Sequence, residues 1–217
     1  MKTKNKDSGS QAQERTLIHI PIIHTQEDMG SFSELIREAS LKEHGEKSWN
    51  QKVWLINEIW GEIDRIVTSL DLKDKKVRLY QDGLPVCGRE LEIVTDVART
   101  GSLNHQLLLR LIKSGATLMG TESADLLLEE YNLVKNTLVP GNVEEAATPE
   151  VSREKVIKTL LKKRDQYIAG QINTTLAGGE TGILFLGMLH SIENLLNKDI
   201  RVKYPFIQPR GDITVLK

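Results

Sequence analysis

The stretch that decides the fold is GILFLGMLH, Gly182 to His190, in which an almost wholly apolar run ends at a single histidine. A strand this hydrophobic is typical of the interior of a sheet that is covered on both faces, and sheets of that kind are usually parallel. Open α/β sheets place their ligands just past the carboxyl ends of the strands. His190 is therefore expected either to act on a ligand or to cap a core strand.

Further segments have the composition of short strands, and helical segments separate them. Strands are expected within 16–25, 75–88, 116–123 and 199–209, and helices over 31–40, 48–70, 89–100, 104–115, 124–138 and 153–176. This alternation predicts an α/β fold with a mixed, largely parallel central sheet covered by helices. Ser31 and Glu34 have capping-box spacing, so a helix is expected to begin there. Trp54 and Trp60 recur at helical spacing and are expected to pack in the core.

The composition fits one globular domain, because 39% of the 217 residues are hydrophobic and 27% are charged. Residues 1–15 are polar and are expected to form a disordered tail. Residues 16–217 are expected to form a single α/β domain. Within it, 139–152 contains both prolines of this region and lacks apolar periodicity, which predicts a flexible loop that covers the site.

Charge and cysteine content restrict the partners. The formal net charge of −1 provides no general attraction for nucleic acid or anionic lipid. Cys87 is the only cysteine of the chain, which excludes an internal disulfide framework and a cysteine-based zinc site. No apolar run approaches the length of a membrane span. We therefore expect a cytoplasmic protein without nucleic-acid or membrane partners. A homo-oligomer is also possible, because exposed helices that carry tryptophans could form a dimer interface.

Polar side chains follow four of the predicted strands where each strand ends: His24, Asp82, Glu122 and His190. In a mostly parallel sheet these ends lie on one edge, so the side chains could converge in a single cleft. Imidazoles together with carboxylates suit a divalent transition metal, which can generate a nucleophile from water near neutral pH. His24, His190 and Glu122 are the expected metal ligands. Asp82 is expected as a further ligand or acid–base group, and Asp28 could join from the following loop.

Each of these residues also has a plain structural explanation. Asp82-Gly83 is an ordinary turn signal, and Glu122-Ser123 is a common way to begin a helix. A histidine after a strand is more often a capped or surface residue than a ligand. The recurrence of polar residues at successive strand ends is what favours a shared site.

Arg164 and Asp165 are further candidates, on the helix that precedes the His190 strand. Arg164 could hold an anionic or oxyanionic group, although a Lys-Lys-Arg-Asp run is usually a solvated face. The sequence contains no G-x-S-x-G, no P-loop and no G-x-G-x-x-G motif.

The segment KKRDQYIAGQINTTLAGGETGILFLGMLH, Lys162 to His190, resembles a late motif of the superfamily that groups TraB/PrgY proteins, Tiki proteases, ChaN-like haem-binding lipoproteins and erythromycin esterases. The shared features are an arginine-containing helix, here with Arg164, followed by a strand and a GxxH sequence that ends at His190. GATLMGTES is similar to the strand that ends in the family's carboxylate, here Glu122, and IPIIHT is similar to the first histidine motif, here His24.

The resemblance implies a mixed sheet with two pseudo-repeated halves whose histidines meet at one cleft, and metal-dependent hydrolysis in some members. The chain departs from the pattern in two places. Pro21 stands where the first GxxH has glycine, and Asp82 stands where a glutamate is usual.

Three hypotheses follow from the sequence. The first is a metal-dependent hydrolase acting on a small molecule or peptide, with Glu122, Arg164 and Asp82 as catalytic groups and a divalent metal ion on His24, His190 and Glu122. The second is a non-catalytic ligand-binding or regulatory protein, which the altered first motif at Pro21 favours. The third treats all of these residues as turns and caps.

Overall fold

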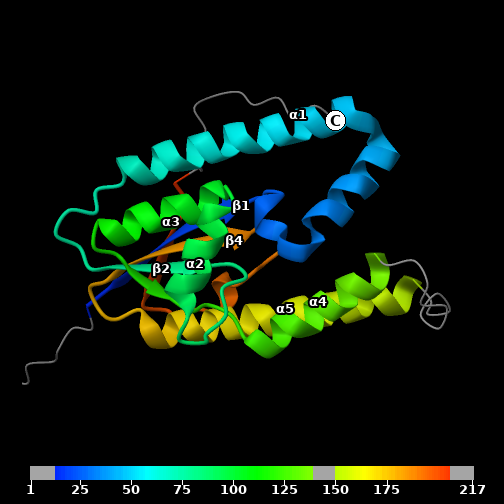
Figure 1. Ribbon diagram of the computed structural model, residues 1–217. Helices are drawn as coiled ribbons and strands as arrows, with labels where there is room; N and C mark the ends of the chain where they lie inside the picture. Colours follow the sequence, from blue (N-terminus) through cyan, green and yellow to red (C-terminus); the bar gives the residue numbers. More distant parts are fainter. Residues whose placement is uncertain (1–12, 139–149, 206–217) are drawn as a thin grey trace, which may run out of the picture.

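The computed structural model describes residues 13–138 and 150–205, in which five strands form one parallel sheet with five α-helices around it (Figure 1). The strands are β1 (Arg15–Ile22), β2 (Val77–Gln81), β3 (Thr117–Met119), β4 (Thr181–Gly187) and β5 (Ile200–Lys203). Their order in the sheet is β3-β2-β4-β1-β5. The predicted α/β fold is confirmed, and every pairing among the described strands is parallel, without the antiparallel strand of a mixed sheet.

Helices cover both faces of this sheet (Figure 1). One face carries α1 (Ser33–Ser69), α2 (Glu90–Arg99) and α3 (Leu103–Lys113). The other carries α5 (Glu150–Thr175), against which α4 (Ala124–Leu138) packs. Two short 3-10 helices complete the described elements, η1 (Glu27–Phe32) after β1 and η2 (Glu193–Leu195) after β4.

The apolar composition of β4 follows from this arrangement. Ile183 and Phe185 pack into the core on the side of α1, α2 and α3, while Leu184 and Leu186 pack into the core beneath α5. All four side chains are fully buried. Each such side chain stabilises the fold by about 1.5–3 kcal/mol, so β4 anchors both halves of the core.

Pro21 occupies an inner strand without interrupting the sheet. β1 pairs with β4 as far as Ile22, but its pairing with β5 ends at Ile18. Near Pro21, β1 therefore has only one neighbour among the described strands, which is a place where a sheet tolerates proline.

The longest helix differs from the prediction in three respects. It begins at Ser33, two residues after Ser31, and runs to Ser69 as one element with a kink at Gly45. The third difference is Trp54: the prediction that it packs in the core was wrong, because 63% of this residue is exposed. Trp60 is buried as expected, and its Nε1 donates a hydrogen bond to the Ile23 carbonyl at 3.0 Å.

Two predicted boundaries also shift. Arg15, assigned to the terminal tail, is the first residue of β1 and is buried, with hydrogen bonds to Asp199 and to carbonyls at the end of α5. Of the predicted loop over 139–152, residues 139–149 lie outside the described residues, and α5 already begins at Glu150. In the part of the chain that is described, no helix combines the length and apolar character that crossing a bilayer requires.

Candidate functional site

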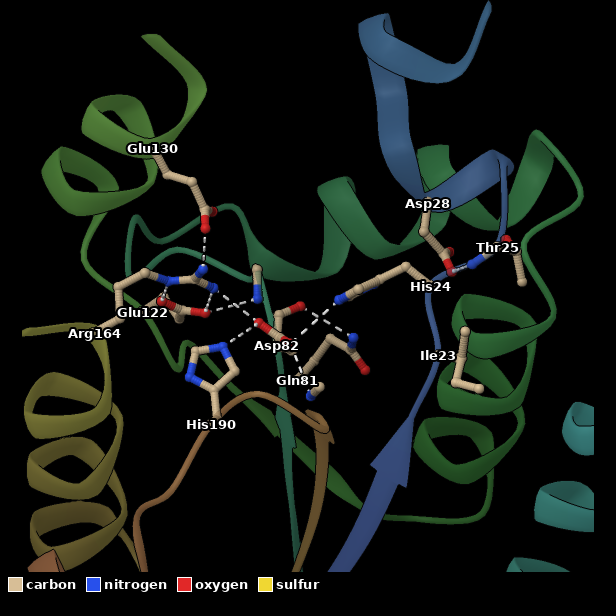
Figure 2. A network of polar contacts seen from close by, with 12 residues as sticks. Ile23, His24, Thr25, Asp28, Gln81, Asp82, Glu122, Glu130, Arg164 and His190 are labelled. Atoms are coloured by element: carbon tan, nitrogen blue, oxygen red, sulfur yellow. Dashed lines mark hydrogen bonds and ion pairs between the residues drawn. The ribbon is translucent and has the colours of Figure 1, made fainter. Parts of the chain in front are cut away.

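The four strand-end residues converge, as the sequence predicts, at the carboxyl edge of the sheet (Figure 2). The order β3-β2-β4-β1 places Glu122, Asp82, His190 and His24 after four adjacent strands. Asp82 lies between the two histidines, which approach its carboxylate from opposite sides. His24 Nε2 is 3.2 Å from Asp82 Oδ2, and His190 Nε2 is 3.6 Å from Asp82 Oδ1.

Asp82 is the centre of the site, and its side chain is only 3% exposed. Its backbone N–H donates to the Phe185 carbonyl of β4 at 2.9 Å, which fixes the end of β2. Its Oδ2 accepts from the Gly187 N–H at 2.9 Å, and its Oδ1 accepts from Arg164 Nη2 at 2.9 Å. Burial alone would raise the pKa of this carboxyl, but the contacts and charges of His190 and His24 hold the pKa well below its usual range. Asp82 is therefore ionised.

Arg164 reaches the site from α5 and joins three carboxylates. Its Nε donates to Glu122 Oε2 at 2.8 Å, while Nη2 donates to Glu122 Oε1 and to Asp82 Oδ1. Its Nη1 donates to Glu130 Oε1 of α4 at 2.7 Å. Burial lowers the pKa of the guanidinium, but these carboxylates raise the pKa by more, so Arg164 stays positively charged. The structure places Arg164 as a clamp on the acidic residues of the site.

Glu122 is completely buried beneath this clamp. Its Oε1 also accepts from the Gly83 N–H at 3.0 Å, which ties the turn after β2 to the end of β3. Burial and the neighbouring charge of Asp82 raise the pKa of Glu122, and the hydrogen bonds and charge of Arg164 offset this rise only in part.

His190 is oriented by the residue that follows Arg164 in sequence. His190 Nδ1 lies 2.6 Å from Asp165 Oδ1, and Asp165 Oδ2 accepts from the Ser191 N–H at 3.1 Å. Because a carboxylate only accepts hydrogen bonds, Nδ1 carries the proton and Nε2 faces Asp82. This is the arrangement that carboxylates impose on metal-ligating and catalytic histidines. Burial lowers the pKa of His190, but the contacts with Asp82 and Asp165 outweigh burial and raise it.

His24 is the more accessible of the two histidines, since 38% of its side chain is exposed. Burial lowers its pKa, but the hydrogen bond and charge of Asp82, together with the charge of Asp28, outweigh burial and raise it. His24 is thus able to hold a proton at the open side of the site.

Asp28 does not join the ligands and instead fixes the segment after His24. Its Oδ2 accepts from the Thr25 N–H at 2.8 Å, and its Oδ1 accepts from Ser102 Oγ at 2.5 Å. His105 Nδ1 lies 2.7 Å from Ser102 Oγ and 3.3 Å from Asp28 Oδ1. His105, which has no functional signal in the sequence beyond its place near a helix start, therefore helps to attach the β1 end to α3.

Gly187 is required by the close approach of Asp82. A Cβ atom at Gly187 would lie 2.7 Å from Asp82 Oδ2 and 3.7 Å from both His24 Nε2 and His190 Cδ2. The glycine of the G-M-L-H sequence thus lets the Gly187 N–H reach the carboxylate. Close backbone approach accounts for this glycine.

A cleft of about 570 Å³ opens above these residues, within the size range of small-molecule sites. Asp82, Arg164, His24 and His190 all contribute to its lining. Glu122 and Asp165 lie behind the lining, where they bond to Arg164 and His190.

Asp82, Glu122 and His190 together could hold a metal ion, because each offers one ligand atom and these atoms lie within 4.8 Å of one another. The set differs from the predicted His24, His190 and Glu122, since Asp82 takes the place of His24. Two carboxylates and one imidazole form a donor set that divalent transition metals accept. Asp165 would then be the carboxylate that orients the ligating histidine.

Glu130 is the residue of the site that sequence reasoning missed. It lies on α4 within an ordinary helical pattern, and nothing in its spacing distinguishes it from the exposed Glu129 beside it. Its contact with Arg164 is visible only once α4 and α5 pack together.

A comparison with protein-family models found no family that matches this chain, and searches of curated proteins and of solved structures also found no match.

Proposed function

We propose that the cleft is the active centre of a metal-dependent hydrolase. The observation that carries the proposal is the buried set of Asp82, Glu122 and His190, whose ligand atoms lie within 4.8 Å of one another. Asp82 and His190 line the cleft, and Glu122 lies directly behind them. The resemblance of Lys162 to His190 to a superfamily with hydrolytic members points in the same direction.

The charges around the site favour a cation. The carboxyl groups are Asp28, Asp82, Glu122, Glu130 and Asp165, and the groups that can carry positive charge are Arg164, His24, His105 and His190. The carboxyl groups therefore outnumber the groups that can be positively charged. Buried carboxylates without full compensation are costly, and a divalent cation would relieve that cost.

A divalent ion held by Asp82, Glu122 and His190 would supply Lewis acidity to the scissile bond and lower the pKa of water at the site. The chain itself would supply the remaining functions. Arg164 keeps both carboxylates in place, and Asp165 keeps Nε2 of His190 directed at the centre. His24, at the open side and 3.2 Å from Asp82, is the group placed to give a proton to the leaving group.

The test is the metal content of the purified, untagged protein by inductively coupled plasma mass spectrometry. Wild type and His44→Ala, a histidine exposed outside the cleft, are expected to hold one divalent metal per chain. His190→Ala and Asp82→Asn are expected to lose it, together with any activity found in a panel of chromogenic esters, amides and phosphate esters. Wild type without metal after incubation with manganese, cobalt, zinc or iron would refute the metal site.

A hydrolase that works without metal is the second candidate, and one observation favours it. Each carboxylate oxygen of Asp82 and Glu122 already has a partner in Arg164, Gly83, Gly187 or His24. In that case His190, oriented by Asp165, would act as the general base. Activity that persists in a strong chelator but is lost in His190→Ala would select this candidate.

A further inference from the structure

The cleft combines a charged floor with apolar walls. Met29 and Phe32 line one wall, next to the end of β1, and Leu127 and Tyr131 of α4 line the opposite wall with Leu161 of α5. The two walls touch where the rings of Phe32 and Tyr131 pack with centroids 4.7 Å apart. The cleft is therefore bounded on that side.

Apolar surface continues from the cleft to its mouth. Met188 and Leu189, between Gly187 and His190, line the cleft although 67% and 83% of these residues are exposed. Their position is fixed by the turn in which the His190 N–H donates to the Gly187 carbonyl at 3.1 Å. Large apolar side chains held in solvent directly beside polar reactive groups are a feature of ligand-binding surfaces.

The floor beneath these walls is negatively charged. Asp28, Asp82 and Glu130 line the cleft, and Glu122 and Asp165 lie directly behind it. Arg164 is the sole arginine or lysine among the described residues that line the cleft, and four of its N–H groups already point to carboxylates. These five carboxyl groups outnumber Arg164 and the nearby imidazoles of His24, His105 and His190, and a bound divalent ion with neutral His190 would not make the floor positive.

We propose that the substrate is a small, uncharged ester or amide that binds through an apolar alkyl or aryl group. The apolar group lies between the two walls and against Leu189, while the carbonyl group reaches His190 and Asp82. The cavity volume of about 570 Å³ fits a small molecule. This inference rests on the proposed hydrolysis for its chemistry, but the binding preference can be measured separately.

Hydrolysis of such an ester or amide needs no reactant other than water. The water oxygen bonds to the carbonyl carbon, the bond from that carbon to the leaving oxygen or nitrogen breaks, and the leaving group takes a proton. The products are a carboxylic acid, ionised at neutral pH, and an alcohol or amine. The negative floor repels the new carboxylate, so it favours release of the acid product.

Binding of a matched pair of probes tests the inference. 5-Phenylpentan-2-one is an uncharged ketone that cannot be hydrolysed, and 4-phenylbutyrate carries the same phenylpropyl group with a negative charge. Titrations followed by ligand-observed nuclear magnetic resonance at neutral pH are expected to give about tenfold or more tighter binding of the uncharged probe, the size expected for one charge near a carboxylate. Equal affinities, or tighter binding of the anion, would overturn the inference.

Variants locate the binding and its charge preference. Leu189→Ser is expected to weaken binding of the uncharged probe severalfold, whereas Leu55→Ser, at an exposed leucine of α1 outside the cleft, is expected to leave it unchanged. Glu130→Gln removes a carboxylate whose side chain is 41% exposed and is expected to strengthen binding of the anion. Equal effects of Leu189→Ser and Leu55→Ser would count against the cleft as the binding site.

The inference and the proposed hydrolase fail in different experiments. Tight binding of the uncharged probe to both wild type and His190→Ala, without turnover of any ester or amide, supports the apolar site while refuting the hydrolase. Hydrolysis confined to anionic substrates supports a hydrolase and overturns the apolar, uncharged class.

Discussion

At the level of single residues, the geometry of the site directly constrains the substitution of Gly187. Gly187→Ala would put a Cβ atom 2.7 Å from Asp82 Oδ2, against a buried carboxylate that also accepts the Gly187 N–H. We expect the free energy of unfolding to fall by about 1–3 kcal/mol, as for other overpacked sites. Urea denaturation followed by circular dichroism measures the change.

The matched control is Gly170→Ala within α5, where an added Cβ meets nothing within 4 Å. Because alanine has the higher helix propensity, this variant is expected to be neutral or more stable by up to about 1 kcal/mol. If both variants had the same stability, close approach of Gly187 to Asp82 would not be the reason for the glycine.

The lowered pKa of the Asp28 carboxyl predicts that the stability of the protein depends on pH. Burial would raise its pKa, but hydrogen bonds from His105, Ser102 and Thr25 lower the pKa below its usual value. A pKa lowered by folding stabilises the fold above the unfolded value of about 4, and this stabilisation is lost as the pH falls through the folded-state pKa. Asp28→Asn is therefore expected to cost about 1.5–3 kcal/mol at pH 7, and less as the pH falls below 4.

Denaturation of wild type and Asp28→Asn at a series of pH values between 2 and 7 measures this difference. Asp96→Asn serves as the control, because Asp96 pairs with Arg99 on the surface and such pairs contribute little. A difference between wild type and Asp28→Asn that is the same at every pH would show that the charge of Asp28 does not contribute.

At the scale of the element, α5 connects the site to the core. Its buried face holds Ile168 and Ile172 against the sheet, and one turn earlier Arg164 and Asp165 point to Glu122 and His190. Arg164→Met would leave Asp82 and Glu122 buried without their cationic partner. We expect a loss of about 3–5 kcal/mol, the range for breaking buried ion pairs.

Lys162→Met is the control on the same helix, since Lys162 is exposed, and it is expected to change stability little. Arg164→Lys keeps the positive charge but not the planar set of donors. Its loss of unfolding free energy is therefore expected to lie between the losses of Arg164→Met and Lys162→Met. Urea denaturation of the three variants provides the comparison. Equal stability of Arg164→Met and Lys162→Met would mean that the carboxylates do not depend on the clamp.

For the whole molecule, the sheet predicts a gradient of backbone protection. β4 is paired on both sides and buried on both faces, whereas β3 and β5 are edge strands among those described. Hydrogen exchange measured by mass spectrometry should therefore be slowest for peptides covering 181–187 and faster for those covering 117–119 and 200–203. Exchange in β5 as slow as in β4 would indicate that another chain or segment pairs with that edge.

The parts of the fold that depend on local pattern were predictable from the sequence. The parallel sheet, the strand ends at His24, Asp82, Glu122 and His190, and Ser123 at the start of α4 follow from composition and turn chemistry, and Ser123 Oγ accepts from the Leu126 N–H at 3.4 Å. The position of Trp54 was not predictable, because α1 extends past the sheet core while its periodic pattern continues.

The contacts between distant segments could not be predicted. Glu130 and Arg164 meet because α4 packs on α5, and Asp28 turns to Ser102 because η1 lies beside the start of α3. For the same reason the candidate ligand set includes Asp82 in place of His24. Their chemical types were visible in the sequence, but their partners depend on tertiary packing.

The pairing of β1 also has a consequence for synthesis of the protein. β1 covers Arg15–Ile22, yet its described partners are β4 and β5, more than 150 residues later in the chain. During translation this strand leaves the ribosome long before either neighbour, with both of its hydrogen-bonding edges open. Until β4 has emerged, β1 is a candidate for chaperone binding or mispairing. Ribosome-bound chains that end before Thr181 should therefore lack the protease resistance of the finished fold.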